Sequence, residues 1–249
     1  MAYQSVEADE VTFLPLHPRG YYQPPTPGAN ASFWNLEYYQ KYFDVDTITV
    51  ATRCYTTLLP LSPSYLSAHL TPSPDLYGPF WTLTTLIFCL YVFSSLASSL
   101  TAYLSGAEVD YNFSLLSIAV TLVYSYGLGF PVLLWVVLRY FGVSEWSVVE
   151  AVAVWGYGQF VWIPVSILCV IPVPIVRWVL VGAGFGVSGY FLVANVYPVI
   201  ATAEAKAVRG LVVLVAVLHA ALALTFKVLF FSYYIKEIGE SARVVLSDS

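Results

Sequence analysis

Charged residues are scarce in this sequence, and their scarcity limits the class of protein. Of the 249 residues only 10% are Asp, Glu, Lys or Arg, whereas 59% are hydrophobic. A soluble domain carries about 25% charged residues. A chain this poor in charge cannot cover itself with hydrated side chains, so we interpret it as an integral membrane protein.

Basic runs are lacking as well. Ten Lys and Arg residues stand against fifteen Asp and Glu, which gives a formal net charge of -5. A nucleic-acid-binding protein gathers Lys and Arg on one face or in one run. The sequence therefore predicts no nucleic-acid partner.

Groups that hold metals or perform catalysis are also few. Three Cys without a CxxC pair, and three His, form no disulfide framework and no zinc pattern. Paired carboxylates, a Ser/His/Asp arrangement and a phosphate-binding loop are missing. The glycines of 184–189 fit a dinucleotide-binding pattern, but they lie in an apolar run without a βαβ unit. We predict no catalytic residue, no metal and no cofactor.

Long apolar runs are what the sequence has in abundance. A membrane-spanning helix takes about 20 apolar residues, and five runs after residue 79 are long enough. We predict an all-α polytopic membrane protein, with five transmembrane helices and a short cytosolic N-terminal region that contains amphipathic helices. The membrane domain covers 75–233, with spans at approximately 80–104, 113–138, 151–171, 178–200 and 211–233.

The region before the spans divides into two parts. Residues 1–32 are rich in proline and are predicted to be disordered. Residues 33–74 contain apolar side chains at helical spacing, which predicts two short helices, the second capped by Asp44 or Asp46. Because so short a segment cannot build its own core, its apolar faces must meet the membrane surface, the protein's own helices or a partner.

The orientation of the chain rests on acidic segments, because Lys and Arg near the membrane are evenly divided. The acidic N-terminus shows no signal peptide. The first connection between spans has Glu108 and Asp110 but no basic residue. We expect the N-terminus to be cytosolic and the tail 234–249 to be lumenal.

Small residues in the spans predict close helix packing. Gly182 and Gly186 are four residues apart and would form a flat stripe on one helix. Gly156 and Gly158 are expected to serve similar close approach or kinking.

The polar residues in the spans are expected to have structural roles. Tyr124, Tyr126 and Gln159 are expected to hydrogen-bond between helices. Lys227 is expected to extend to the membrane surface from the end of its helix. His219 has no acidic residue in any span to pair with, so we expect no proton relay.

Residues Asp75 to Trp81 begin the membrane domain. Asp75 is expected to cap the first span, Gly78 to permit a tight turn, and Pro79 to be the first helical residue. One interpretation is a helix start with no partner role. The other is that this turn fixes the angle between the cytosolic helices and the membrane. In that hypothesis Tyr77 forms one cytosolic surface for partners, together with Trp34, Tyr38 and Val50.

Three motifs together resemble one family. Asp75-Leu76-Tyr77-Gly78-Pro79-Phe80-Trp81 resembles the DLYGPFW signature of the YIP family, the Ypt/Rab-interacting membrane proteins of the Golgi. Gly156-Tyr157-Gly158, followed by Pro164, resembles the family's mark in the third span. Two upstream segments, Phe33 to Gln40 and Phe43 to Thr47, resemble the corresponding segments of the family branch that contains members one and two.

This resemblance implies a function that composition does not. It implies a non-enzymatic five-span protein of Golgi membranes and vesicles, which takes part in vesicle-mediated transport. It also implies binding to Rab GTPases and to other YIP-family proteins, in addition to the lipid bilayer. The alternative is a small transporter, channel or lipid-handling protein, because Gly-rich and Pro-broken helices also line transport paths.

Overall fold

The computed structural model describes residues 36–59, 65–71, 73–106, 112–143, 146–202 and 205–232. The predicted disordered segment 1–32 and the predicted tail 234–249 lie outside these residues. All regular elements among the described residues are helical. The chain divides into two units, residues 1–41 and 42–249.

The described residues of the first unit form one short helix, α1, at Leu36–Gln40. The rings of Tyr38 and Tyr39 meet edge to face with their centroids 5.2 Å apart. The Lys41 ammonium lies 5.0 Å from the centroid of the Tyr38 ring, a distance at which a cation is attracted to the ring face.

The second unit contains helix α2 (Thr47–Leu58), a short π-helical turn η1 (Leu66–Leu70) and five long apolar helices. These helices are long and apolar enough to cross a membrane, which confirms the five predicted spans. They are α3 (Tyr77–Ser105); α4, η2 and α5 (Ser114–Tyr124, Ser125–Gly129 and Phe130–Tyr140); α6, η3 and α7 (Val148–Gly158, Gln159–Val161 and Trp162–Leu168); α8 (Pro174–Ile200); and α9 (Ala205–Leu229).

Local sequence signals explain where several of these helices begin. Asp46 caps α2 by accepting a hydrogen bond from the backbone N–H of Ile48 at 3.1 Å. Ser147 and Glu150 form a reciprocal capping box at the start of α6, so two backbone N–H groups that the helix leaves open are paired.

Two spans change their winding, and prolines account for both changes. Pro131 has no N–H for the carbonyl of Gly127, and the helix widens into the π-helical turn η2. Pro164 has no N–H for the carbonyl of Phe160, and the helix tightens into the 3-10 turn η3. In both places the altered turn lets a span continue past a missing hydrogen bond.

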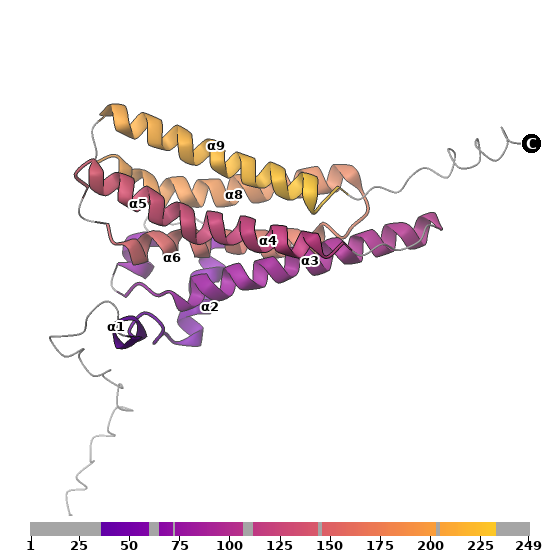
Figure 1. The fold of residues 1–249 in the computed structure, drawn as a ribbon, viewed down its shortest axis with the longest axis horizontal. Helices are drawn as coiled ribbons and strands as arrows, with labels where there is room; N and C mark the ends of the chain where they lie inside the picture. The colour runs from indigo at the N-terminus through magenta and orange to yellow at the C-terminus, as the bar shows by residue number, and fades with distance from the viewer. Residues whose placement is uncertain are drawn as a thin grey trace, which may run out of the picture. The chain divides into compact units, whose positions relative to one another are not determined.

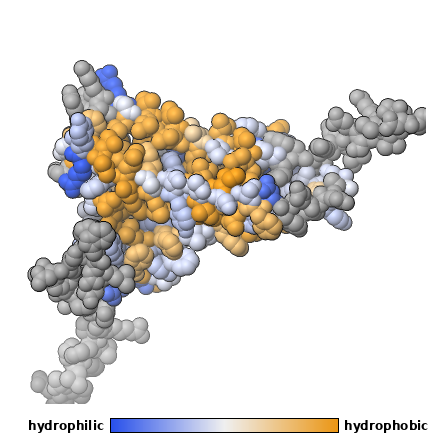
Figure 2. Space-filling model, viewed as in Figure 1, coloured by the Kyte–Doolittle hydropathy of each residue, from blue (hydrophilic) through white to orange (hydrophobic). Residues whose placement is uncertain are grey.

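The third span is the central helix of the bundle. In the most apolar 18-residue stretch of this span 72% of the residues are buried, whereas the share is 33% to 39% in the corresponding stretches of the other four spans. Helices α3, α5 and α8 pack around α6, and α9 packs along α8 (Figure 1). Figure 2 shows that apolar side chains cover much of the visible outer surface of the bundle, as the hydrocarbon of a bilayer requires.

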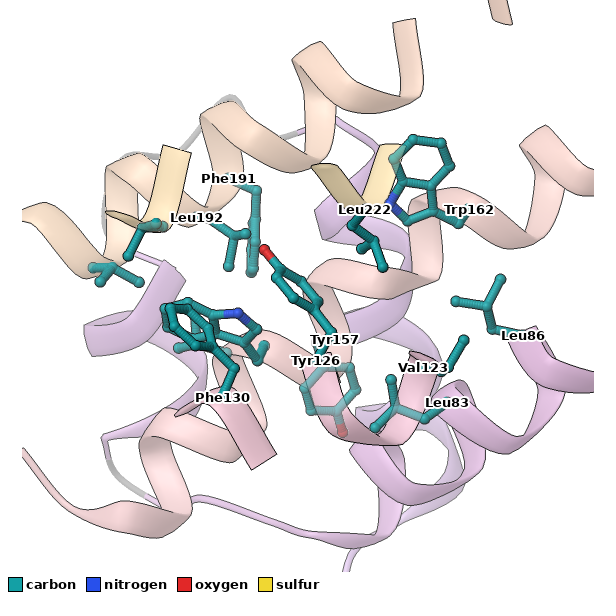
Figure 3. Close-up of a cluster of buried hydrophobic side chains, with 14 of the residues drawn as sticks. Leu83, Leu86, Val123, Tyr126, Phe130, Tyr157, Trp162, Phe191, Leu192 and Leu222 are labelled. Atoms are coloured by element: carbon teal, nitrogen blue, oxygen red, sulfur yellow. The ribbon is translucent and has the colours of Figure 1, made fainter. Parts of the chain in front are cut away.

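Glycines let the central helix approach its neighbours. A Cβ atom at Gly156 would lie 2.4 Å from Cβ of Pro79, and one at Gly158 would lie 3.1 Å from the Phe191 ring. Figure 3 shows the side chains of Tyr157 and Trp162 from this span among Leu83, Phe191 and others from neighbouring helices. The first and third spans therefore meet almost backbone to backbone.

The structure corrects the prediction for Gly182 and Gly186 within the chain. Both are exposed, and no heavy atom lies within 4 Å of the place where a Cβ would be. Gly184, between them, faces Val165 and Trp162 at 3.0 and 3.3 Å instead. The packed face of α8 is thus the one with Gly184, and a contact of Gly182 and Gly186 with another chain stays a prediction.

These environments predict opposite outcomes for one kind of substitution. Gly156→Ala places a methyl group against Pro79, and overpacking of this kind costs about 1–3 kcal/mol. Gly182→Ala adds a methyl group in open space and improves helix propensity, so stability should stay equal or rise. Thermal unfolding of both variants in the same detergent checks this. Equal Tm values would contradict the packing described here.

Candidate functional site

A buried ion pair joins α2 to the start of the first span. Arg53 lies in the middle of α2, and Asp75 lies just before α3. The Arg53 guanidinium pairs with the Asp75 carboxylate, and the two side chains are only 5% and 3% exposed. Nη2 of Arg53 also donates to the carbonyl of Ser73 at 2.8 Å. The guanidinium therefore ties α2 to the segment that leads into the membrane.

The same carboxylate reaches two further elements. Its Oδ2 accepts a hydrogen bond from the backbone N–H of Gly78, in the first turn of α3, at 2.7 Å. The hydroxyl of Tyr157, on the central helix, lies 2.9 Å from both carboxylate oxygens and donates to them. Asp75 thus receives donors from α2, from α3 and from α6.

This arrangement meets the electrostatic requirement of a buried charge. A buried carboxylate is strongly destabilising unless it is paired and hydrogen-bonded. Here the counter-charge comes from Arg53, and the positive end of α3 adds to it. Because every donor comes from a different element, the carboxylate holds all three in place together.

The structure corrects the predicted roles of Gly78 and Pro79. Among the described residues only Gly106 and Gly142 have positive φ, so Gly78 does not serve a left-handed turn. A Cβ atom at Gly78 would lie 1.9 Å from the Tyr157 hydroxyl. Gly78 is therefore required because Tyr157 must reach Asp75. The helix begins at Tyr77, two residues before Pro79.

Helix α2 packs by its inner face on the membrane helices. Arg53, Cys54 and Thr57 are buried there. Tyr65 donates its hydroxyl to the carbonyl of Arg53 at 3.1 Å, and its ring lies edge-on to Phe191 at 4.7 Å. The inner face of α2 therefore packs on the protein's own helices, and not on the membrane surface or on a partner.

Burial has a chemical effect on the groups beneath α2. It raises the pKa of the Cys54 thiol, to which the Asp75 carboxylate adds, although a contact with Thr82 opposes the rise. It raises the pKa of Tyr65 well above its usual value. Both groups therefore stay protonated at neutral pH while α2 is docked.

The structure tests only part of the partner surface predicted from the sequence. Asp75 and Gly78 are buried, and Val50 packs partly against the core, whereas Tyr77 is 39% exposed. Tyr38 belongs to the first unit, and Trp34 lies outside the described residues. Asp75 and Gly78 therefore cannot touch a partner, and their place is inside the fold.

A different apolar face of α2 is open. Ile48, Tyr55 and Leu59 are 75%, 61% and 54% exposed. Ile48 and Tyr55 are seven residues apart on α2, on the side away from Arg53 and Cys54. Leu59 directly follows the last turn of α2, four residues after Tyr55. We refer to Ile48, Tyr55 and Leu59 as the outer stripe of α2.

A second polar cluster lies halfway along the spans. His219 of α9 has Nδ1 2.9 Å from the Tyr126 hydroxyl and Nε2 2.9 Å from Oγ of Ser188. Ser188 donates its single hydroxyl hydrogen to the carbonyl of Gly184 at 2.6 Å. Nε2 must therefore donate to Ser188, and Nδ1 must accept from Tyr126.

The direction of these bonds limits what the cluster can do. Ser188 is fully buried and its proton is committed, so it is not placed to attack a substrate. The cluster joins three spans by hydrogen bonds, and its residues are too far apart in sequence to be recognised as a group. Within the described ranges no group of His, Cys, Asp and Glu could hold a metal ion.

Other intramembrane polar residues differ from their predictions in part. Tyr124 bonds between helices as expected, to Thr84 at 2.9 Å. The amide of Gln159 has no hydrogen-bond partner among the described residues. Lys227 does not extend outward. It is 1% exposed, donates to the carbonyl of Phe231 at 3.3 Å and lies 4.7 Å from the Trp178 ring centroid.

Comparison with known proteins identifies similar chains. A model of the Yip1 domain family matches residues 57–225. A protein named YIPF1 homolog from Dictyostelium discoideum is 35% identical over 208 residues, which are 81% of this chain and 57% of that protein. A protein named YIP5 from Schizosaccharomyces pombe is 33% identical, over 76% of this chain and 78% of that protein. A protein named YIP5 from Saccharomyces cerevisiae is 27% identical, over 63% of this chain and 57% of that protein. No solved structure matches the chain significantly.

The buried carboxylate predicts the behaviour of a nearby thiol. Asp75→Asn leaves the Arg53 charge buried without its partner, which typically costs about 3–5 kcal/mol. Helix α2 should then detach, and Cys54 should react with a maleimide much faster than in the parent protein. The rate is measured with Cys89→Ala and Cys169→Ala in the background, so that Cys54 is the one thiol left.

Asp46→Asn is the matched control for this experiment. It is the same substitution at an exposed aspartate of the same segment, and Asn caps a helix as well as Asp. Its alkylation rate should equal that of the parent. Equal rates for the Asp75→Asn variant and the parent would show that the ion pair does not hold α2.

Proposed function

The chain belongs to the Yip1 family of membrane proteins, and from this premise we propose that it acts in vesicle-mediated protein transport. It is a non-enzymatic protein of Golgi membranes and Golgi-derived vesicles. Its partners are Rab GTPases and other YIP-family members, which it binds from a membrane domain with a cytosolic N-terminus and a lumenal C-terminus.

The outer stripe of α2 is the observation that carries this proposal. Exposed apolar side chains on one helix face mark a site for a protein or a membrane. The Arg53–Asp75–Tyr157 contacts hold the opposite face of α2 against the bundle. A face held in one orientation loses little conformational freedom when it binds, and this favours affinity for a partner.

The polar groups inside the spans support a role without catalysis. The Tyr126, His219 and Ser188 side chains bond to one another or to backbone within the bundle. An intramembrane enzyme or an ion path needs such groups to face a substrate or water. In this chain they join helices, as suits a domain that anchors and presents a cytosolic surface.

The proposal is tested by making the stripe polar. In the triple variant Ile48→Ser, Tyr55→Ser and Leu59→Ser, binding of purified, GTP-loaded, prenylated Rab GTPases should be lost. The assay measures binding to the protein in nanodiscs for each GTPase of a panel. Protection of Cys54 from maleimide shows in the same sample that α2 is still docked.

The control keeps the stripe apolar while changing its shapes. Ile48→Leu, Tyr55→Phe and Leu59→Ile should retain most of the binding, because the apolar area is nearly unchanged. If the serine variant binds every GTPase as well as the parent does, α2 is not the docking face. If the parent binds none of the panel, the Rab part of the proposal is wrong.

The proposed orientation has its own test. Asn30-Ala31-Ser32 is a glycosylation pattern, and a cytosolic N-terminus would leave Asn30 unmodified. An Asn-Gly-Ser-Thr tag added after Ser249 should receive a glycan in the same cells. Digestion with an endoglycosidase and a gel shift distinguish the outcomes. A glycan on Asn30 would reverse the proposed topology.

A further inference from the structure

Helices α8 and α9 pack side by side (Figure 1). An open groove with a volume of about 230 Å³ lies between them. Gly186, Gly189 and Val193 contribute to its wall from α8, and Val212 and Ala216 contribute from α9. Gly186 and Ala216 are exposed, so the groove opens on the outer surface of the bundle rather than into its core.

The groove lies within the depth of the bilayer. On α8 it runs from Gly186, at the middle of the span, to Ile200, the last residue of the helix. The fourteen helical rises from Gly186 to Ile200 cover about 21 Å. The groove therefore begins near the bilayer midplane and ends where α8 meets the membrane surface, beside the first turns of α9.

We propose that this groove binds one acyl chain of a membrane phospholipid. It is a long, apolar furrow that runs along the spans and opens toward hydrocarbon. Its length along α8 suits a single long acyl chain, which would enter from the surface end. The binding does not depend on a GTPase or on the outer stripe of α2.

Water is a poor occupant of this groove. A water molecule in a cavity needs two to four polar partners. His219 lies at the inner end, but both of its ring nitrogens already bond to Tyr126 and Ser188. Apart from His219, only Tyr190 and Tyr197 among the lining residues have a polar side-chain atom, and the other lining residues offer no side-chain hydrogen bond. Hydrocarbon needs no such partner and fills the space instead.

A helix from a second copy is too wide to lie inside the groove. An α-helix with its side chains is about 10 Å across, and packed helix axes are about 8–10 Å apart. A partner helix could therefore lie over the line between α8 and α9 but not within it, whereas a single acyl chain is narrow enough to lie within it.

The surface end of the groove suits a phosphate. Arg209 is exposed and lies three residues before Val212, one turn nearer the membrane surface on the same side of α9. Tyr197, half exposed, lines the same end from α8. A guanidinium and a tyrosine at this depth match the headgroup region, where such residues anchor. A phospholipid therefore fits better than an uncharged sterol.

The test uses photoreactive phosphatidylcholine, with a diazirine in one acyl chain, in nanodiscs that contain the full chain. After illumination, mass spectrometry should find the label concentrated on residues 185–200 and 212–219. Gly186→Leu and Ala216→Leu fill the groove from exposed positions and should abolish that label. Arg209→Gln should reduce it without moving it.

Gly182→Leu is the matched control. Gly182 has the same open surroundings as Gly186 and lies four residues away, but it does not line the groove. Its label should equal that of the parent, and thermal unfolding shows whether each variant is folded. Binding of the Rab panel should be unchanged in all of them, so this proposal and the proposed function can fail separately.

Three results would overturn the proposal. One is a label spread evenly over all lipid-facing helices. Another is a dimer in the parent that Gly186→Leu converts to a monomer, because a second copy would then cover the groove. The third is displacement of the label by a sterol but not by unlabelled phospholipid, which would assign the groove to a different ligand.

Discussion

The buried carboxylate of Asp75 is the constraint on which the rest of the structure depends. It accepts from Arg53 of α2, from the first turn of α3 and from Tyr157 of the central helix. A charge this well shielded from water is tolerable only while all its hydrogen-bond donors are present, so the three elements must be assembled together. Glycines follow from the same requirement. Gly78 leaves the space that the Tyr157 hydroxyl occupies, and Gly156 lets the third span reach the first at Pro79.

The cytosolic role that we propose follows from how this interaction divides α2 into two faces. The inner face carries Arg53 and Cys54 and is buried against the membrane helices. The outer stripe is left without a described partner and is held in a fixed orientation. A residue needed for the inner face can impair partner binding without contacting a partner. Loss of binding on changing Asp75 would therefore report the position of α2, and only the outer stripe tests the contact itself.

The sequence was sufficient for the spans but not for the contacts between them. Each span is a local property, an apolar run of the right length, and all five are found. The cap of α2 at Asp46 is equally local. Asp75 and its partners are separated by 22 and 82 residues, so only the folded bundle brings them together. Gly182 and Gly184 differ by two residues on one helix, and a sequence without a known neighbour does not say which of them faces inward. The motif that includes Asp75 did mark the right segment, although its residues act inside the fold.

The placement of polar groups follows the depth at which each one lies. Full charges lie at the ends of the bundle, where Arg53 and Asp75 precede the first span and Arg177 donates to the carbonyl of Ile171 at 2.9 Å. At mid-depth the chain of donors runs from Tyr126 through His219 to Ser188 and ends on a backbone carbonyl, so it needs no counter-charge. A charge there would be far more destabilising, because hydrocarbon cannot solvate it. A neutral cluster with every ring nitrogen paired gives the α8–α9 groove an inner end that neither attracts an ion nor requires water. This is the condition under which an acyl chain can lie against a histidine.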